Sequence, residues 1–274
     1  MTNDTDFTLD VLYGAKPPAA ASLYGALGQS QNPRPGESLY KSFKETGIKA
    51  EGLAVDVGCR DAAFACNVVK FFKCRVIGID PVDNNLRNAQ AKVKQQGVVG
   101  QLDLLRGALP LLPLKGESCD AIWCSDVMTY APDLRECLDE CARVLKPGGG
   151  MMLYQTLAGE SMTPAESEWL FTRMGGVPRN HDQAYFEGAI KESRFEIQKK
   201  DVISSEFREY FEETGNRMTS LQLLRMARML RKRDALIAES GPVRYEAELA
   251  ECYWGVWQMM GKLCPVVYVL KKPA

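Results

Sequence analysis

The sequence has little of what metal sites, membrane spans and nucleic-acid surfaces require. Its 274 residues include one histidine, and the nine cysteines form no Cys-x-x-Cys pair, so we expect no metal site. No apolar run reaches the ~18 residues that a transmembrane helix needs, so we expect no membrane span. The 34 basic residues nearly balance the 35 acidic ones. No overall field therefore draws the chain onto nucleic acid, and no nucleic-acid partner is expected.

The cysteines also indicate a cellular compartment. Their odd number and scattered positions, in a chain of this size, are typical of reduced thiols rather than of a disulfide scaffold. The first residues are polar and acidic, and no signal peptide is visible. We therefore expect a cytoplasmic protein, whose oligomeric state the sequence leaves open.

The stretch Leu53–Phe64, LAVDVGCRDAAF, predicts a buried strand, a tight turn and the start of a helix. Asp56 lies near the end of this strand, and Gly58 would let a ligand approach the backbone closely. A second predicted strand ends in Asp80, about 24 residues later, at the edge where open α/β sheets bind ligands. Two carboxylates there favour a cationic or hydroxyl-rich ligand over a pyrophosphate. The turn also lacks the GxGxxG pattern of dehydrogenases.

Strand-like and helix-like segments alternate along most of the chain, which indicates a parallel sheet covered by helices. Strands are expected at residues 52–57, 75–79, 101–106, 119–124, 151–155, 195–200 and 265–270. Helices are expected at residues 37–47, 62–72, 83–96, 132–145, 165–174 and 183–193. The glycine-rich segment Pro147–Gly150 is expected to end the fourth of these helices.

Four segments resemble the successive motifs of class I S-adenosylmethionine-dependent methyltransferases. They are VDVGCRDAA, VIGIDP, LPLKGESCDAIWCSDVMTYAPD and RVLKPGGGMML, and they cover roughly Leu53 to Tyr154. The closest resemblance is to the small-molecule group that includes the ubiquinone/menaquinone-biosynthesis methyltransferases. It implies an α/β, Rossmann-like, seven-stranded and mostly parallel sheet with helices on both faces, whose last strand is antiparallel. It also implies S-adenosyl-L-methionine as cofactor and methyl transfer to O, N or C of a small molecule.

The resemblance assigns a set of cofactor-binding residues. Asp80 would hold the ribose hydroxyls, Pro81 would lie against the adenine, and the remaining positions would surround the cofactor: Asp56, Gly58, Cys59, Gly107, Ala108, Leu109, Cys124 and Asp126. The family often has an aspartate where Ala108 stands, so only backbone contacts are implied there, and a plain turn is an equal alternative.

Two departures from the family pattern lie in the first turn. Arg60 stands where a glycine is common, and Ala62 replaces another glycine. Arg60 would place a cation beside a positively charged cofactor, or it could pair with Asp61 or point outward.

Three residues are candidates for the catalytic side, each with a structural alternative. Tyr130 stands where many relatives have histidine, and it could orient a substrate, act as a weak base or serve in packing. His181, the only histidine, lies in a polar loop, where it could act as a general base or be solvated. Tyr24 belongs to an N-terminal arm that, by the resemblance, could fold over the cofactor, or that could be a loosely packed leader.

We expect four parts of the chain: an arm at 1–36, a core at 37–204, a helical cap at 205–262 and a last core strand at 263–274. In the cap, Thr219 or Ser220 could begin a helix whose basic stripe comprises Arg225, Arg228 and Lys232. This stripe could bind a phosphate, an anionic lipid surface or RNA, or be a solvated face. The aromatic residues at 253, 254 and 257 could line an apolar pocket or pack in the core.

Two other functions remain open from the sequence. The incomplete glycine turn and Ala108 are compatible with a non-catalytic protein that binds S-adenosylmethionine and regulates another process. The basic stripe is compatible with a methyltransferase acting on RNA or protein. The substrate and the acceptor atom are not predicted.

Overall fold

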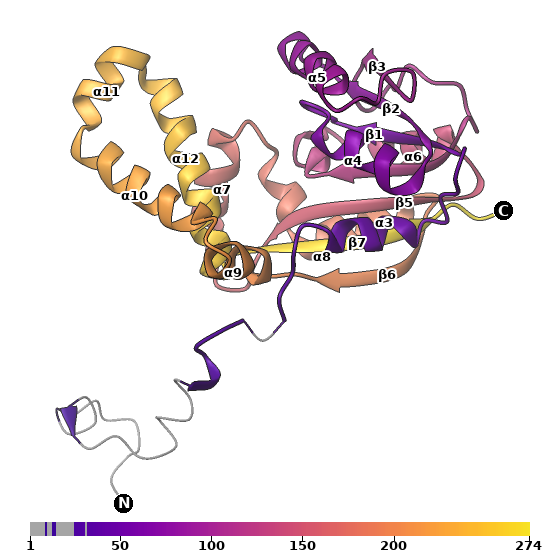
Figure 1. The fold of residues 1–274 in the computed structure, drawn as a ribbon. Coiled ribbons are helices and arrows are strands. Elements are labelled where there is room, and N and C mark those ends of the chain that lie inside the picture. The colour runs from indigo at the N-terminus through magenta and orange to yellow at the C-terminus, as the bar shows by residue number, and fades with distance from the viewer. Residues whose placement is uncertain (1–8, 10–12, 15–24, 31) are drawn as a thin grey trace, which may run out of the picture.

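The computed structural model describes residues 9, 13–14, 25–30 and 32–274, and its centre is one seven-stranded sheet (Figure 1). The strand order is β3-β2-β1-β4-β5-β7-β6. The strands are β1 (Leu53–Val57), β2 (Arg75–Asp80), β3 (Leu102–Arg106), β4 (Cys119–Ser125), β5 (Leu145–Ala158), β6 (Glu196–Val202) and β7 (Leu263–Lys271). Strands β1 to β5 are parallel, and β7 runs antiparallel to both β5 and β6. The predicted fold class is confirmed.

Helices cover both faces of the sheet because its central strands are apolar on both sides. Alternate residues of β1 point to opposite faces: Val55 packs in one core cluster and Ala54 in the other. The first face carries α6 (Leu134–Val144) and α8 (Gln183–Glu192). The second carries α3 (Ser38–Lys44), α4 (Ala63–Phe72) and α5 (Asp83–Gln95).

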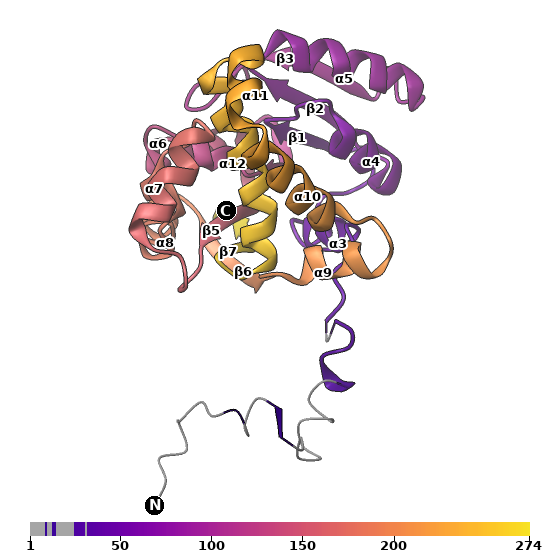
Figure 2. The same cartoon turned by 90° about the vertical axis from the view of Figure 1, so that its left-hand side faces the viewer.

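Four helices lie between β6 and β7: α9 (Glu206–Glu213), α10 (Met218–Arg231), α11 (Arg233–Ser240) and α12 (Pro242–Met259). Strand β6 is antiparallel to β7, which is antiparallel to β5, so β6 ends at the same edge as the parallel strands. Because α9 follows β6 directly, these helices begin at the edge where the parallel strands have their carboxyl ends. Figures 1 and 2 show them standing out from the sheet at that edge. Helix α7 (Pro164–Arg173) packs against α12.

The start of β5 differs from the sequence prediction. Helix α6 ends at Val144, before the glycine segment, and β5 begins at Leu145 rather than at Met151. The pairing of β4 with β5 is irregular there, since Cys119 faces Leu145 whereas Ala121 faces Gly150. A Cβ on Gly150 would lie 2.6 Å from the carbonyl oxygen of Thr46. Gly150 therefore serves close packing inside a strand, as does Gly149, where an added Cβ would lie 2.9 Å from the carbonyl oxygen of Lys146.

The start of α10 was also predicted wrongly. The helix begins at Met218, so neither Thr219 nor Ser220 is its N-cap residue. Instead the Glu212 carboxylate accepts hydrogen bonds from the backbone N–H groups of Thr219 (2.6 Å) and Ser220 (3.0 Å). A side chain from the preceding helix thus satisfies donors that an N-cap residue usually satisfies.

Candidate functional site

The turn after β1 needs glycine at one position. Gly58 has φ +72°, and a Cβ there would lie 2.3 Å from Cγ2 of Val127. The N–H groups of Gly58 and Cys59 both donate to the carbonyl oxygen of Ile79, at 2.8 and 3.0 Å. The turn is therefore anchored to the end of β2, and its close contact with the residue after Asp126 excludes any side chain at position 58.

The same turn keeps a glycine-like conformation at two positions that have no glycine. Arg60 and Ala62 adopt φ values of 52° and 59°. Such left-handed conformations cost an L-residue roughly 1–2 kcal/mol. Of the alternatives for Arg60, the ion pair with Asp61 is not formed, and Asp61 pairs with Lys92 instead. The Arg60 side chain is exposed, and it forms no ion pair with any residue that the structure describes.

The Asp80 carboxylate is buried and fixed by three hydrogen bonds. Its Oδ2 accepts from the Arg60 N–H (2.9 Å), and its Oδ1 accepts from the Val82 N–H (2.9 Å) and from Asn85 Nδ2 (3.0 Å). A carboxylate offers about four acceptor positions. Asp80 thus has room for about one further donor, and for a second if Asn85 moves away. The sequence analysis missed Asn85, whose only signal is its place in the first turn of the helix after Asp80.

Asp56 is buried on the neighbouring strand. Burial raises the pKa of its carboxyl to about 8, and the nearby Asp80 carboxylate adds to the increase. A buried acid beside a second acid is stabilised by a cationic or hydrogen-bond-donating ligand, since either would favour its ionised form.

Two predicted cysteines have side chains in the protein interior. The Cys59 sulfur lies beside Gly78, where an added Cβ would be 3.0 Å from it. Cys124 is fully buried in the core cluster of β1, β4 and α6. Burial raises the pKa of both thiols well above the ordinary value. The side chains of Cys59 and Cys124 are therefore packing groups, and only their main chains could face a ligand.

The loop after β3 comes to the Asp80 side of the edge. The Gly107 N–H donates to the Asp80 carbonyl oxygen at 3.3 Å. A Cβ on Gly107 would lie 2.6 Å from Cδ of Pro113, so this position also requires glycine. Ala108 and Pro81 are exposed, and Leu109 is half-buried. The structure thus gathers the predicted residues that follow β2 and β3.

On the other side, Asp126 links the ends of β4 and β5. Its carboxylate accepts from the Thr156 N–H at 2.7 Å and from Thr156 Oγ1 at 3.2 Å. Burial raises the pKa of the Asp126 carboxyl to about 6, although the two hydrogen bonds from Thr156 lower it. Thr156 was missed because nothing in the local sequence marks it as the partner of a residue 30 positions earlier.

His181 is buried, so its predicted alternative of a solvated side chain is wrong. Its Nδ1 lies 2.8 Å from the Thr156 carbonyl oxygen, which can only accept, so Nδ1 carries the proton. Its ring stacks on Phe171, with centroids 3.3 Å apart. Nε2 has no hydrogen-bond partner among the described residues. Burial lowers the pKa of His181 to about 4, so the ring is neutral at pH 7.

Tyr130 is exposed, with 56% of its surface accessible, whereas His181 is buried. Partial burial raises the pKa of its phenol above the usual value, and the Asp126 carboxylate adds to this effect. The raised pKa makes Tyr130 a proton donor or a hydrogen-bonding group rather than a base. Tyr24 lies outside the described residues.

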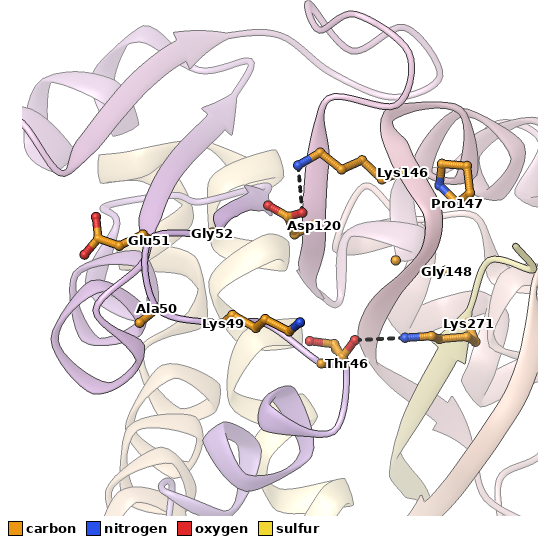
Figure 3. A pocket seen from close by; sticks show the side chains of 12 residues that line it. Thr46, Lys49, Ala50, Glu51, Gly52, Asp120, Lys146, Pro147, Gly148 and Lys271 are labelled. Carbon is orange, nitrogen blue, oxygen red and sulfur yellow. Dashed lines mark hydrogen bonds and ion pairs between the residues drawn. The ribbon is translucent and has the colours of Figure 1, made fainter.

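A hollow of about 390 Å³ lies at the opposite edge of the sheet (Figure 3). Lys146 Nζ pairs with the Asp120 carboxylate there at 2.7 Å, and Lys271 Nζ donates to the Thr46 carbonyl oxygen at 3.3 Å. Residues just before β1 and at the start of β5 complete the lining. None of the predicted site residues lines this hollow, so it is separate from the candidate site.

Two absences bear on the site, and both concern the described residues alone. Nowhere in that part of the chain do three His, Cys, Asp or Glu side chains gather as metal ligands would. Nor does any helix within it combine the length and apolar character needed to cross a membrane.

Comparisons with known proteins agree with this geometry. Residues 55–153 match a family described as "Methyltransferase domain". The sterol 24-C-methyltransferase erg6 of Aspergillus fumigatus is 29% identical over 131 residues, which cover 48% of this chain and 35% of that protein. That of Saccharomyces cerevisiae is 24% identical over 163 residues, 58% of this chain and 42% of the relative. The chain thus spans less than half the length of these curated relatives.

Solved structures show the same fold. The [4+2]-cyclase SpnF superposes with a TM-score of 0.70 at 16% identity, covering 93% of both chains. The geranyl diphosphate C-methyltransferase of Streptomyces coelicolor A3(2) gives 0.61 at 13% identity, covering 88% of this chain and 83% of that one. The specific relation to the ubiquinone/menaquinone group stays a prediction. The ordered motifs and the strand order agree with this similarity of residues 55–153 to a methyltransferase domain, and the solved structures show that the fold is Rossmann-like.

Proposed function

We propose that this chain is an S-adenosylmethionine-dependent methyltransferase that methylates O, N or C of a small molecule. The observation that carries the proposal is the pair of buried acids, Asp56 and Asp80, at neighbouring strand ends beside the Gly58 turn. S-adenosylmethionine, when bound, supplies a methyl group activated by its positively charged sulfur.

The donors of the turn favour such a ligand over a phosphate. Phosphate-binding turns keep several backbone N–H groups free for the anion. Here the N–H groups of Gly58 and Cys59 donate to Ile79, that of Arg60 donates to Asp80, and that of Ala62 donates to Cys59. With these donors used internally and two carboxyl groups nearby, the edge suits a ligand that is cationic and rich in hydroxyl groups.

Each acid would have a distinct part in holding the cofactor. Asp80 would accept a bond from a ribose hydroxyl, at the acceptor position that its three internal hydrogen bonds leave. Asp56 would gain from positive charge, which favours its ionised form. The main chain at Gly58, Cys59, Gly107 and Ala108 would complete the contact, together with Pro81 and Leu109.

We assign the acceptor side to the ends of β4 and β5. Thr156 ties two groups together there, since Asp126 accepts its N–H and His181 donates to its carbonyl oxygen. His181 is then a positioning residue, because its lowered pKa makes it a weak base. Tyr130, exposed beside this unit, would contact the substrate.

The helices between β6 and β7 would act as a cap that shapes the substrate site, with core and cap divided at residues 205 and 262. Rings of α7 and α12 cluster where the cap meets β5: Tyr253 lies 5.0 Å from both Trp169 and Trp257, centroid to centroid. Trp254 meets His181 edge-on at 6.3 Å. This aromatic surface, and the sterol and geranyl diphosphate names of the similar proteins, support a largely apolar substrate.

A radiolabelled-methyl assay tests the proposal. Purified protein would be incubated with labelled S-adenosylmethionine and a panel of sterols, prenyl alcohols, quinones and amines. We expect label in at least one acceptor, and loss of transfer in the Asp80→Asn variant. Cofactor binding without label in any acceptor would contradict methyl transfer.

The second candidate is a protein that binds the cofactor without transferring a methyl group. The similarity to SpnF favours it, because that chain is named a cyclase and shares the fold over 93% of both lengths. Arg60 and Ala62, which stand in the turn where the family pattern has glycines, also favour this candidate. An RNA or protein methyltransferase has less support.

We further propose a cytoplasmic location, on the ground that all nine cysteines are free thiols.

A further inference from the structure

Helix α10 and its flanks carry an excess of positive charge. Between residues 216 and 233 there are six basic residues and no acidic one, in a chain whose net charge is −1. The six are Arg217, Arg225, Arg228, Arg231, Lys232 and Arg233, and all are exposed. Within the described residues only Arg233 forms an ion pair, with Asp234 at 3.6 Å. Five of the six therefore have no ion-pair partner among the described residues, although Glu212 is near enough to Arg217 to interact with its charge.

The same helix exposes large apolar side chains. Five of them have 36 to 50% of their surface accessible: Met218, Leu221, Leu223, Leu224 and Leu230. None of the five belongs to the core clusters formed by the described residues. The stripe that faces α12 consists of Gln222, Met226 and Met229, at i, i+4 and i+7, and these side chains are half-buried or buried.

Leucines and arginines share one flank of α10, away from the centre of its contact with α12. Leu221, Leu224, Arg225, Arg228 and Arg231 recur at i, i+3, i+4, i+7 and i+10, so they form one stripe. Figure 1 shows α10 and α11 projecting from the rest of the molecule, and α10 packs against α12. The stripe is thus presented to the surroundings.

We propose that this stripe binds the surface of an anionic lipid bilayer. Guanidinium groups pair with lipid phosphates, while leucines enter the boundary between headgroups and acyl chains. Charge complementarity argues for a polyanionic partner, and the interspersed leucines favour a bilayer over RNA, whose backbone gives them no apolar contact. Since the cap begins at the carboxyl edge of the sheet, docking would bring that edge near the membrane. This inference does not depend on the methyltransferase proposal.

Vesicle flotation tests it with the full chain. The probes are liposomes of phosphatidylcholine alone and liposomes enriched in phosphatidylserine. Two double variants remove one component each: Leu221→Ser with Leu224→Ser, and Arg225→Gln with Arg228→Gln. A matched charge control is Arg87→Gln with Lys94→Gln on α5, and Val99→Ser controls for loss of an exposed apolar side chain. Circular dichroism checks that each variant is folded.

We expect the wild-type chain to float with phosphatidylserine vesicles and much less with phosphatidylcholine. The leucine and the arginine variants should each lose about tenfold or more in vesicle affinity, whereas the controls should match the wild type. Absence of vesicle binding by the folded wild type would overturn the proposal. So would full vesicle binding by the leucine variant, or arginine-dependent binding to single-stranded RNA that exceeds binding to the vesicles. Either of the last two results would mark the stripe as a general polyanion or RNA surface.

Discussion

The two edges of the central sheet gather charge of opposite sign and accommodate it differently. At the carboxyl edge, Asp56 and Asp80 are buried next to each other, and no ion pair with a described residue neutralises them. At the opposite edge, Lys146 lies in the open and is paired with Asp120 (Figure 3). Buried acids without cations are costly unless a ligand compensates them, whereas exposed pairs cost and contribute little. This difference is one reason why we propose the carboxyl edge as the binding site.

The largest expected effect is a pH dependence of opposite sign at the two edges. The folded pKa of Asp56 is about 8, above its ordinary value of 3.8, so its ionisation destabilises the fold as pH rises between these values. Asp56→Asn should therefore stabilise the chain relative to wild type by up to roughly 4 kcal/mol more at pH 8 than at pH 5. Urea unfolding at both pH values measures this.

Asp120→Asn is the matched variant at the opposite edge. Partial burial raises the pKa of the Asp120 carboxyl. Hydrogen bonds from the Leu53 N–H and from Lys146 lower it by more, so the pKa lies below 3.8. Its ionised form therefore stabilises the fold above pH 4, and the contribution disappears as pH falls below that value. The variant should lose about 1 kcal/mol at neutral pH. Equal pH responses in the two variants would refute the contrast between the edges.

A smaller effect is expected from adding a methyl group to glycines at the two edges. Gly58→Ala introduces both a left-handed alanine and a contact of 2.3 Å with Val127, and should destabilise the fold by about 2–4 kcal/mol. Gly148 has φ +69° at the opposite edge with nothing within 4 Å of an added Cβ. Gly148→Ala should therefore cost only about 1 kcal/mol. Chemical denaturation gives both values, and similar losses would mean that the contact with Val127 relaxes.

Arg60 places a cation at the acidic carboxyl edge of the sheet. Arg60→Gly should strengthen S-adenosylmethionine binding by up to about fivefold, because it removes a screened repulsion of about 1 kcal/mol. S-adenosylhomocysteine lacks the sulfur charge, so its affinity should change less. Arg60→Lys is the control that keeps the charge. Equal changes for both ligands would show that the Arg60 charge does not act on the sulfur.

The smallest effect is expected from Lys146→Met. Its pair with Asp120 is half-exposed, so the free energy of unfolding should fall by less than about 1 kcal/mol. Cofactor affinity, measured by fluorescence competition, should remain that of the wild type. A changed affinity would mean that the two edges communicate.

The sequence predicted the features that depend on local patterns. Alternating strands and helices, and the placing of Asp56, Gly58 and Asp80 at strand ends, follow from periodicity and short turns. Long-range partners could not be predicted in this way. Thr156 carries no local signal, and Asn85 is marked only by its place in the first turn of the helix after Asp80. His181 lies in a polar stretch, yet its ring is buried against Phe171. The cap of α10 could not be predicted for the same reason. Glu212 of α9 accepts the hydrogen bond at the start of α10, and this contact depends on how the two helices pack.

Calorimetric titration with S-adenosylmethionine tests whether the carboxyl edge of the sheet is the cofactor site. The wild type should bind with a measurable heat, and Asp80→Asn should weaken binding by at least about tenfold, because a charge-assisted hydrogen bond to the cofactor is lost. Asp103→Asn, on an exposed aspartate of the adjacent strand β3, should bind as the wild type does. No heat from the folded wild type, or equal affinity in the Asp80 variant, would contradict the assignment of this edge as the cofactor site.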